Sequence, residues 1–150
     1  MANTYTQIHL HLIFAVQNRA SLIQKSWKDR LYEYITGIIQ QHNHKMIIIN
    51  GMPDHLHIVI GMRPTQSLSD LMQDIKGKSS KWINDNKLAV GKFTWQEGYG
   101  AFSVGVSQIE TTTRYIANQK RHHEKQSFQN EFRAFLQRHG IEWDERYIWG

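Results

Sequence analysis

The sequence contains no cysteine among its 150 residues. This absence excludes disulfide bonds, zinc sites built on thiolates and a cysteine nucleophile, and it is compatible with a reducing cytoplasm. No stretch approaches the roughly 18 apolar residues that a membrane-spanning helix needs. Residues 1–5 also lack the charged segment and apolar run of a signal peptide. We therefore expect a cytoplasmic protein.

Acidic side chains are in the minority, with 13 Asp and Glu against 18 Lys and Arg and a net charge of +5. Such a basic chain favours a polyanionic partner. Its 5 Trp, 6 Tyr and 6 Phe can stack on unpaired bases, although the same rings can also fill a core. A chain of this length fits one domain spanning residues 1–150.

Hydrophobic periodicity predicts alternating strands and helices. The order is strand, helix, two strands, helix, strand and helix, with a short turn at 51–54 that makes the middle strands a hairpin. The predicted strands are 5–17, 44–50, 55–62 and the pieces 93–96 and 101–104. The predicted helices are 21–41, 67–86, one that begins at 107, and 127–138. Capping boxes are expected at 21–24, 67–70 and 107–110.

This order predicts an α+β fold of the ferredoxin-like or RRM-like type. We expect an antiparallel sheet with helices on one face, followed by a C-terminal helix that carries Tyr115. The other face of the sheet is expected to be free for chemistry. The tyrosine helix follows the last strand, so it can lie over that face in its own subunit or in a partner.

Two histidines, His55 and His57, flank Leu56 on the predicted strand 55–62. Side chains alternate along a strand, so both imidazoles lie on one face and form half of a metal site. A bare pair of this kind is more often hydrogen-bonded or solvent-facing histidines. His9 and His11 on the first strand form a rival pair.

Tyr115 and Gln119 are four residues apart in a segment predicted to be helical. At that spacing they lie on the same face, one turn apart. An ordinary amphipathic helix with a half-buried tyrosine and a solvated glutamine would give the same pattern. The pair indicates a catalytic site only if it lies close to His55 and His57 in the folded protein.

Basic side chains lie on two predicted helices and beside the Tyr115 segment. A solvated face is the usual explanation, but the same pattern suits phosphate contacts. The candidate DNA-binding residues are Lys76, Lys78, Lys81, Arg114, Lys120, Arg121 and Lys125.

Taken together, these motifs resemble the IS200/IS605-like single-tyrosine transposases, whose HUH motif is histidine, hydrophobic residue, histidine. By this resemblance His55, His57 and Gln119 match the metal ligands and Tyr115 matches the nucleophile. The motif follows the Pro-Asp turn, which leaves His9 and His11 with a supporting role at most. The resemblance spans residues 9–14, 51–57, 67–72 with 81–84, 95–103, 115–119, and 139–141 with 144–147.

The resemblance implies transposition through single-stranded DNA hairpins at element ends. Attack by the Tyr115 phenolate on a phosphodiester forms a 5′-phosphotyrosine and releases a 3′-OH, which can later rejoin strands without ATP. The implied cofactor is Mg²⁺ or Mn²⁺ as a Lewis acid on the phosphate, while the ligand types alone also allow Zn²⁺. Activation of Tyr115 is expected from the metal or from Arg114 and Lys120. The family is also typically homodimeric, with the tyrosine helix often reaching the metal of the other subunit, and Gly105 is a candidate hinge for such an exchange.

Three alternatives remain at this point. A domesticated relative that processes repeated palindromes would have the same chemistry. A non-catalytic RRM-like module would bind nucleic acid with exposed aromatics and no metal. A replication initiator or relaxase would share the histidines and a tyrosine, but 150 residues leave no room for a helicase, and the Tyr-x-x-x-Gln spacing favours the transposase.

Overall fold

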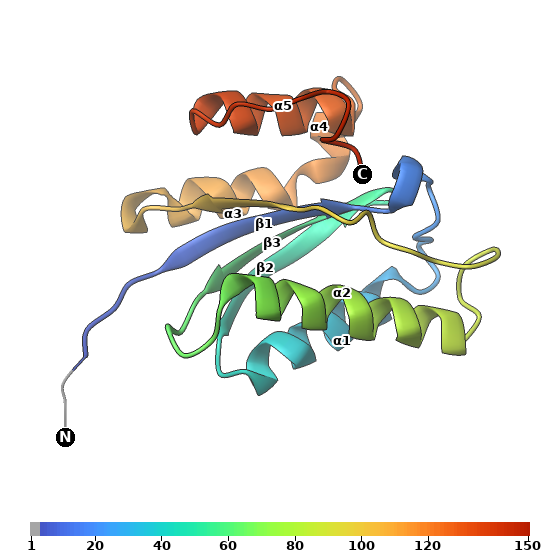
Figure 1. Ribbon diagram of the computed structural model, residues 1–150, viewed down its shortest axis with the longest axis horizontal. Coiled ribbons are helices and arrows are strands. Elements are labelled where there is room, and N and C mark those ends of the chain that lie inside the picture. The colour runs from blue at the N-terminus through green and yellow to red at the C-terminus, as the bar shows by residue number, and fades with distance from the viewer. Residues whose placement is uncertain (1–3) are drawn as a thin grey trace.

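The computed structural model describes residues 4–150 and consists of a four-stranded sheet between two layers of helices (Figure 1). No helix within residues 4–150 is long and apolar enough to cross a membrane. The elements are β1 (His9–Ala15), η1 (Gln17–Arg19), α1 (Lys28–Gln41), β2 (Lys45–Met52), β3 (His55–Gly61), α2 (Leu68–Asp85), β4 (Gly100–Ser103), η2 (Val106–Gln108), α3 (Ile109–Ala117), α4 (Gln119–His123) and α5 (Phe128–Arg138).

The strands are arranged in the order β2-β3-β1-β4, and every neighbouring pair is antiparallel. β1 lies between β3 and β4, with Ile13 opposite both His57 and Gly100. A βαββαβ chain with this strand order is the ferredoxin-like arrangement. The expected α+β fold is therefore confirmed, and the hairpin between β2 and β3 forms at the predicted turn.

The main core lies between one face of the sheet and the helices α1 and α2. Leu12 and Phe14 of β1 and Val16 just after it alternate toward this face. Leu31 and Ile35 of α1 meet them from the helix layer and are fully buried. This packing fixes the register of β1, because a shift by one residue would exchange its two faces.

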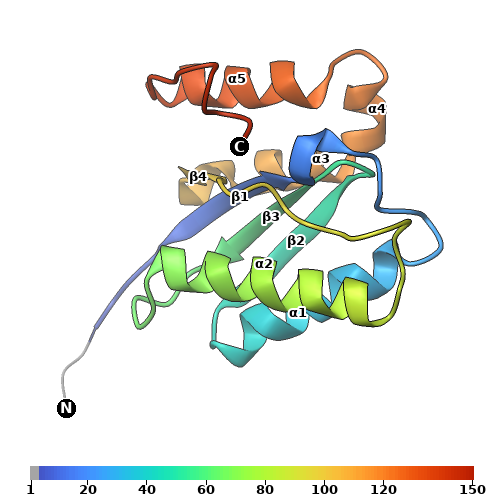
Figure 2. The same cartoon turned by 45° about the vertical axis from the view of Figure 1, so that its right-hand side comes forward.

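The opposite face of the sheet is not open, because α5 covers it (Figure 2). Ile13 and Ala15 of β1 pack in a second apolar cluster. The partners on α5 are Phe128, Phe132, Phe135 and Leu136, which recur at helical spacing. The expectation of a free sheet face is therefore wrong for this chain: the amphipathic stripe of α5 needs an apolar surface and finds it here.

Two of the four predicted helix starts are confirmed, and the other two, at Ser21 and Ser107, are not. Ser67 accepts a hydrogen bond from the Asp70 backbone N–H and caps α2 as expected. Ser127 likewise caps α5. The first helix starts at Lys28 instead of following a cap at Ser21, because residues 21–24 run as irregular chain.

Candidate functional site

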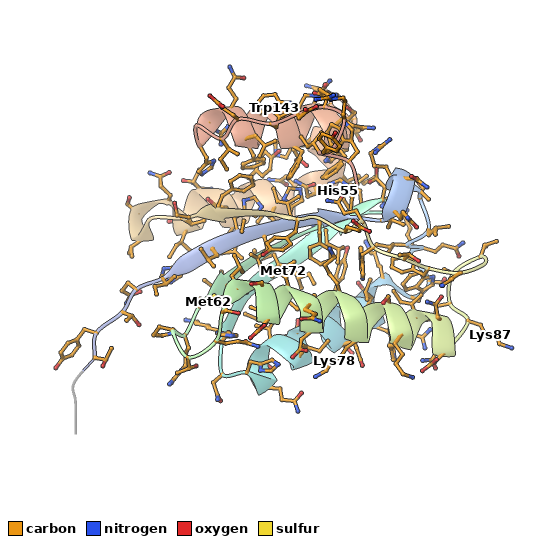
Figure 3. The ribbon with its side chains drawn as sticks, viewed as in Figure 1. His55, Met62, Met72, Lys78, Lys87 and Trp143 are labelled. Carbon is orange, nitrogen blue, oxygen red and sulfur yellow. The ribbon has the colours of Figure 1, made fainter. Side chains whose placement is uncertain are left out.

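The HUH histidines lie on β3 and point to the side of the sheet that α5 covers. Figure 3 shows His55 between the sheet and the C-terminal helices. Both imidazoles are fully buried, with no exposed surface. They lie on the same face because they are two residues apart on a strand, as the sequence predicts.

Each of these histidines has a separate partner on its Nδ1 atom. His55 Nδ1 lies 2.7 Å from Asp54 Oδ1. His57 Nδ1 lies 2.8 Å from Nε2 of His11, which reaches it from the neighbouring strand β1. Both Nε2 atoms are therefore directed into one cluster. Partners on the second ring nitrogen are typical of metal-binding histidines, because they fix the ring orientation.

Tyr115 and Gln119 do not share one helix. α3 ends at Ala117, Asn118 leaves the helical backbone conformation, and Gln119 begins α4. Asn50 of β2 donates its side-chain amide to the Ile116 carbonyl at 2.9 Å, which fastens the end of α3 to the sheet.

The start of α3 also differs from its prediction. A 3₁₀ turn precedes α3, and Gln108 stands at its N-cap without a side-chain cap, so Ser107 does not cap the helix.

Tyr115 nevertheless reaches the histidine cluster of its own chain. Its hydroxyl donates a hydrogen bond to Glu131 Oε2 on α5. Its ring stacks on His122, with ring centres 4.3 Å apart. Burial and the hydrogen bond to Glu131 raise the pKa of the Tyr115 hydroxyl, so the resting side chain is a neutral phenol at neutral pH.

Gln119 is fully buried and lies between a histidine and a carboxylate. Its Oε1 accepts a hydrogen bond from His55 Nε2 at 3.2 Å. Its amide nitrogen donates to Glu131 Oε2 at 3.1 Å. The amide oxygen thus faces the ring nitrogen that a metal would use.

Two further groups complete the cluster, Glu131 on α5 and His123 at the end of α4. The donor atoms of His55, His57, His123 and Glu131 all lie within 4.8 Å of one another. Imidazole and carboxylate donors in such a group can hold a divalent cation.

The electrostatics of the cluster are dominated by the buried carboxylate. Burial alone would disfavour its charge, but hydrogen bonds from His123, His55 and His57 hold the pKa of Glu131 well below its usual range. Burial would also lower the pKa of His55, but Asp54 and Glu131 outweigh it and raise that pKa to about 9. Burial lowers the pKa of His57. The cluster thus contains a carboxylate stabilised by imidazoles.

The predicted DNA-binding residues fall into two groups, one on α3, α4 and the segment after α4, and the other on α2. Arg121 and Lys125 line a hollow of about 500 Å³ that Tyr115 also lines. Arg114 pairs with Glu110 at 3.1 Å on the exposed side of α3. Lys120 is exposed on α4. The members on α2 lie across the sheet from the cluster and comprise Lys76, Lys78 and Lys81.

Neither Glu131 nor His123 is among the site residues predicted from the sequence. A signal for Glu131 is nonetheless present, because it falls on the apolar stripe of α5 beside Phe128, Phe132 and Phe135. A carboxylate on a buried helical face is rare without a charged or hydrogen-bonding partner. His123 has no comparable signal, since it lies in a basic run whose usual explanation is solvation.

Known proteins resemble this chain in sequence and in fold. The family model for IS200-like transposases matches residues 4–119. The ISDra2 transposase TnpA of Deinococcus radiodurans is 26% identical over 119 residues, which cover 75% of this chain and 84% of that protein.

Two solved structures share the fold. A candidate transposase from Deinococcus radiodurans R1 has a TM-score of 0.61 at 22% identity and covers 79% of this chain and 96% of its own. A REP-associated tyrosine transposase bound to a REP hairpin has a TM-score of 0.62 at 13% identity. The match covers 82% of this chain and 73% of that chain. Because the matched family region spans well over half of the sequence, the chain belongs to the IS200-like transposase family.

Proposed function

We propose that this protein is a metal-dependent transposase that cuts and rejoins single-stranded DNA, with Tyr115 as the nucleophile. One observation carries the proposal: the Tyr115 hydroxyl, His55, His57 and Gln119 belong to one hydrogen-bonded cluster of a single chain. A phenol beside a candidate metal site is the arrangement that phosphodiester transesterification needs.

We assign the cation to His55, His57 and Gln119, and we expect Mg²⁺ or Mn²⁺. Two imidazole nitrogens and an amide oxygen are neutral donors, so the bound cation would keep its full charge for the scissile phosphate. Oxygen ligands from the phosphate suit Mg²⁺ and Mn²⁺. The protein's own part is to orient these donors, through Asp54 and His11 on the far ring nitrogens.

In the reaction, the Tyr115 oxygen attacks the phosphorus and the bond to the 3′ oxygen breaks. The downstream strand is then held as a 5′-phosphotyrosine, and the upstream strand leaves with a 3′-OH. A 3′-OH that attacks the phosphotyrosine restores a phosphodiester and frees Tyr115. The number of phosphoester bonds is unchanged, so no ATP is consumed.

The substrate we propose is single-stranded DNA that forms hairpins. Arg121 and Lys125 beside Tyr115 would contact its phosphates, since the hollow they line opens at the nucleophile. A related fold is known with a REP hairpin bound, which supports a hairpin substrate here. We also expect a homodimer, in keeping with the resemblance noted from the sequence.

The test uses single-stranded hairpin oligonucleotides taken from the DNA that flanks the gene, labelled at the 3′ end and incubated with Mg²⁺ or Mn²⁺. The label should become attached to the protein and survive denaturation. Tyr115→Phe should abolish this adduct, because phenylalanine has no oxygen to attack phosphorus. EDTA should abolish it as well, because it removes the cation.

Tyr5→Phe is the matched control, since Tyr5 is 89% exposed and lies outside the cluster. It should form the adduct as wild type does. If Tyr115→Phe formed the adduct at the wild-type rate, the assignment of the nucleophile would be wrong. If wild type bound the hairpins but never formed an adduct, the chain would be a non-catalytic binding module.

A further inference from the structure

Glu131 is an acidic side chain placed where apolar packing would be expected. It lies on the stripe of α5 that packs on the sheet, and only 1% of its surface is exposed. Burying a carboxylate is costly unless charge and hydrogen bonds compensate it. A structural role alone would be served by an apolar side chain of similar size, so the contacts of this carboxylate need a further explanation.

The two oxygens of Glu131 face different groups. Oε1 lies 2.8 Å from His57 Nε2, 3.4 Å from His55 Nε2 and 3.1 Å from His123 Nε2. Oε2 accepts hydrogen bonds from the Tyr115 hydroxyl and from the Gln119 amide. One oxygen therefore lies among the metal-binding nitrogens, and the other holds the nucleophile.

We propose that Glu131 is a further ligand of the divalent cation through Oε1 and a positioning residue for Tyr115 through Oε2. This inference rests on the proposed function, because it concerns the same metal and the same nucleophile. A carboxylate oxygen among imidazoles suits Mn²⁺ better than imidazoles alone do, since oxygen donors favour Mg²⁺ and Mn²⁺. Glu131 is almost fully buried, and its negative charge would offset part of the cation's charge, so the cation would act on the phosphate with a smaller net charge than the three neutral donors alone would leave it.

The inference gives the C-terminal segment a functional role. Glu131 lies outside residues 4–119, the region that the family model matches. α5 is fixed by its own cap at Ser127 and by the second apolar cluster. Metal binding and the docking of α5 would then stabilise each other, because the ligand reaches the cation only when α5 is docked.

The first test measures Mn²⁺ affinity without DNA, by the electron paramagnetic resonance signal of free Mn²⁺ titrated with the metal-free full chain. Glu131→Gln should weaken binding at least about tenfold, a loss that even outer partners of metal ligands can cause. Glu124→Gln is the matched control, because Glu124 is exposed on the same C-terminal segment. It should bind Mn²⁺ as wild type does. Equal affinity in Glu131→Gln and wild type would overturn the ligand assignment.

A measurement on wild type covers the case in which Glu131→Gln does not fold. Mn²⁺ should slow amide hydrogen exchange in α5 as well as in β3, because α5 would hold a ligand. Slower exchange in β3 with no change in α5 would contradict the proposal.

The positioning role is tested at saturating Mn²⁺ with the labelled hairpins. Glu131→Gln should lower the single-turnover rate of adduct formation by about 100-fold, the scale of a misplaced reacting group. The Kd for the hairpin should remain as in wild type. An unchanged rate would overturn this role, whereas absence of any adduct in wild type would instead refute the proposed function, and the Mn²⁺ titration would stand independently.

Discussion

At the scale of single residues, His55 and His57 are oriented by hydrogen-bond partners on the far side of each ring. His55 and His57 present Nε2 to the cluster because Asp54 and His11 hold their Nδ1 atoms. A metal on Nε2 requires the proton on Nδ1, and each partner can accept it.

Asp54→Ala should weaken Mn²⁺ binding by about 10- to 100-fold, the range measured for outer partners of metal-ligating histidines. The substitution removes the acceptor of the His55 Nδ1 proton and with it one of the contacts that orient the ring. Mn²⁺ titration of the metal-free protein provides the measurement. Asp85→Ala serves as the control because its carboxylate pairs with Lys81 on the exposed side of α2. Comparable affinity in the two variants would argue against a supporting role for Asp54.

Among the secondary-structure elements, the break between α3 and α4 decides how the site is assembled. A continuous helix from Ile109 to His123 would keep Tyr115 and Gln119 on one helix face, one turn apart. The break at Asn118 lets α4 change direction, so both side chains reach the same carboxylate. Asn50 stabilises this break, because its side-chain amide donates to a carbonyl in the last turn of α3.

Asn50→Ala should lower the free energy of unfolding by about 1 kcal/mol, the usual contribution of one hydrogen bond. It should also slow adduct formation, because the end of α3 carries Tyr115. Asn86→Ala is matched to it: Asn86 donates to the Trp82 carbonyl at the end of α2, far from the cluster. Denaturant unfolding should show a similar small loss in both variants. The adduct assay should be impaired in Asn50→Ala only, and an equal effect on both would show that Asn50 acts on stability alone.

At the level of the whole molecule, the fold brings Tyr115 to the histidines of its own chain. The sequence left open whether the tyrosine helix serves its own subunit or a partner. In the structure, α3, α4 and α5 pack back over the sheet that carries β3 (Figure 2). A complete cluster therefore forms within a single chain, and a dimer is not required to assemble it.

Mixing two inactive variants distinguishes the two arrangements. Tyr115→Phe keeps its histidines, and His57→Ala keeps its tyrosine. If each site is built within one chain, a mixture of the two remains inactive in the adduct assay, and we expect this result. Recovery of adduct on mixing, at a level that depends on both concentrations, would show that subunits exchange the tyrosine helix. Light scattering on the same samples reports whether dimers are present.

The local patterns of the sequence predicted most of the fold. Alternation along β1 and β3, the Pro-Asp turn, the cap at Ser67 and the helix start at Ser127 depend on a few neighbouring residues, so the printed order of side chains specifies them. The failures came from contacts with distant parts of the chain. Ser21 has the residue pattern of a helix cap. The chain there instead runs beside the β2–β3 turn, where the Ile23 amide donates to the Pro53 carbonyl.

The residue order alone specified a ferredoxin-like sheet and supplied the four side chains that the family resemblance selects. It did not specify what meets those side chains, because the decisive contacts join distant positions. His11 and His57 are 46 residues apart, and His57 and Glu131 are 74 residues apart. Spacing rules for helices and strands do not extend over such distances. Burial of the α5 stripe against the sheet brings Glu131 into the cluster, and this packing is a property of the folded chain.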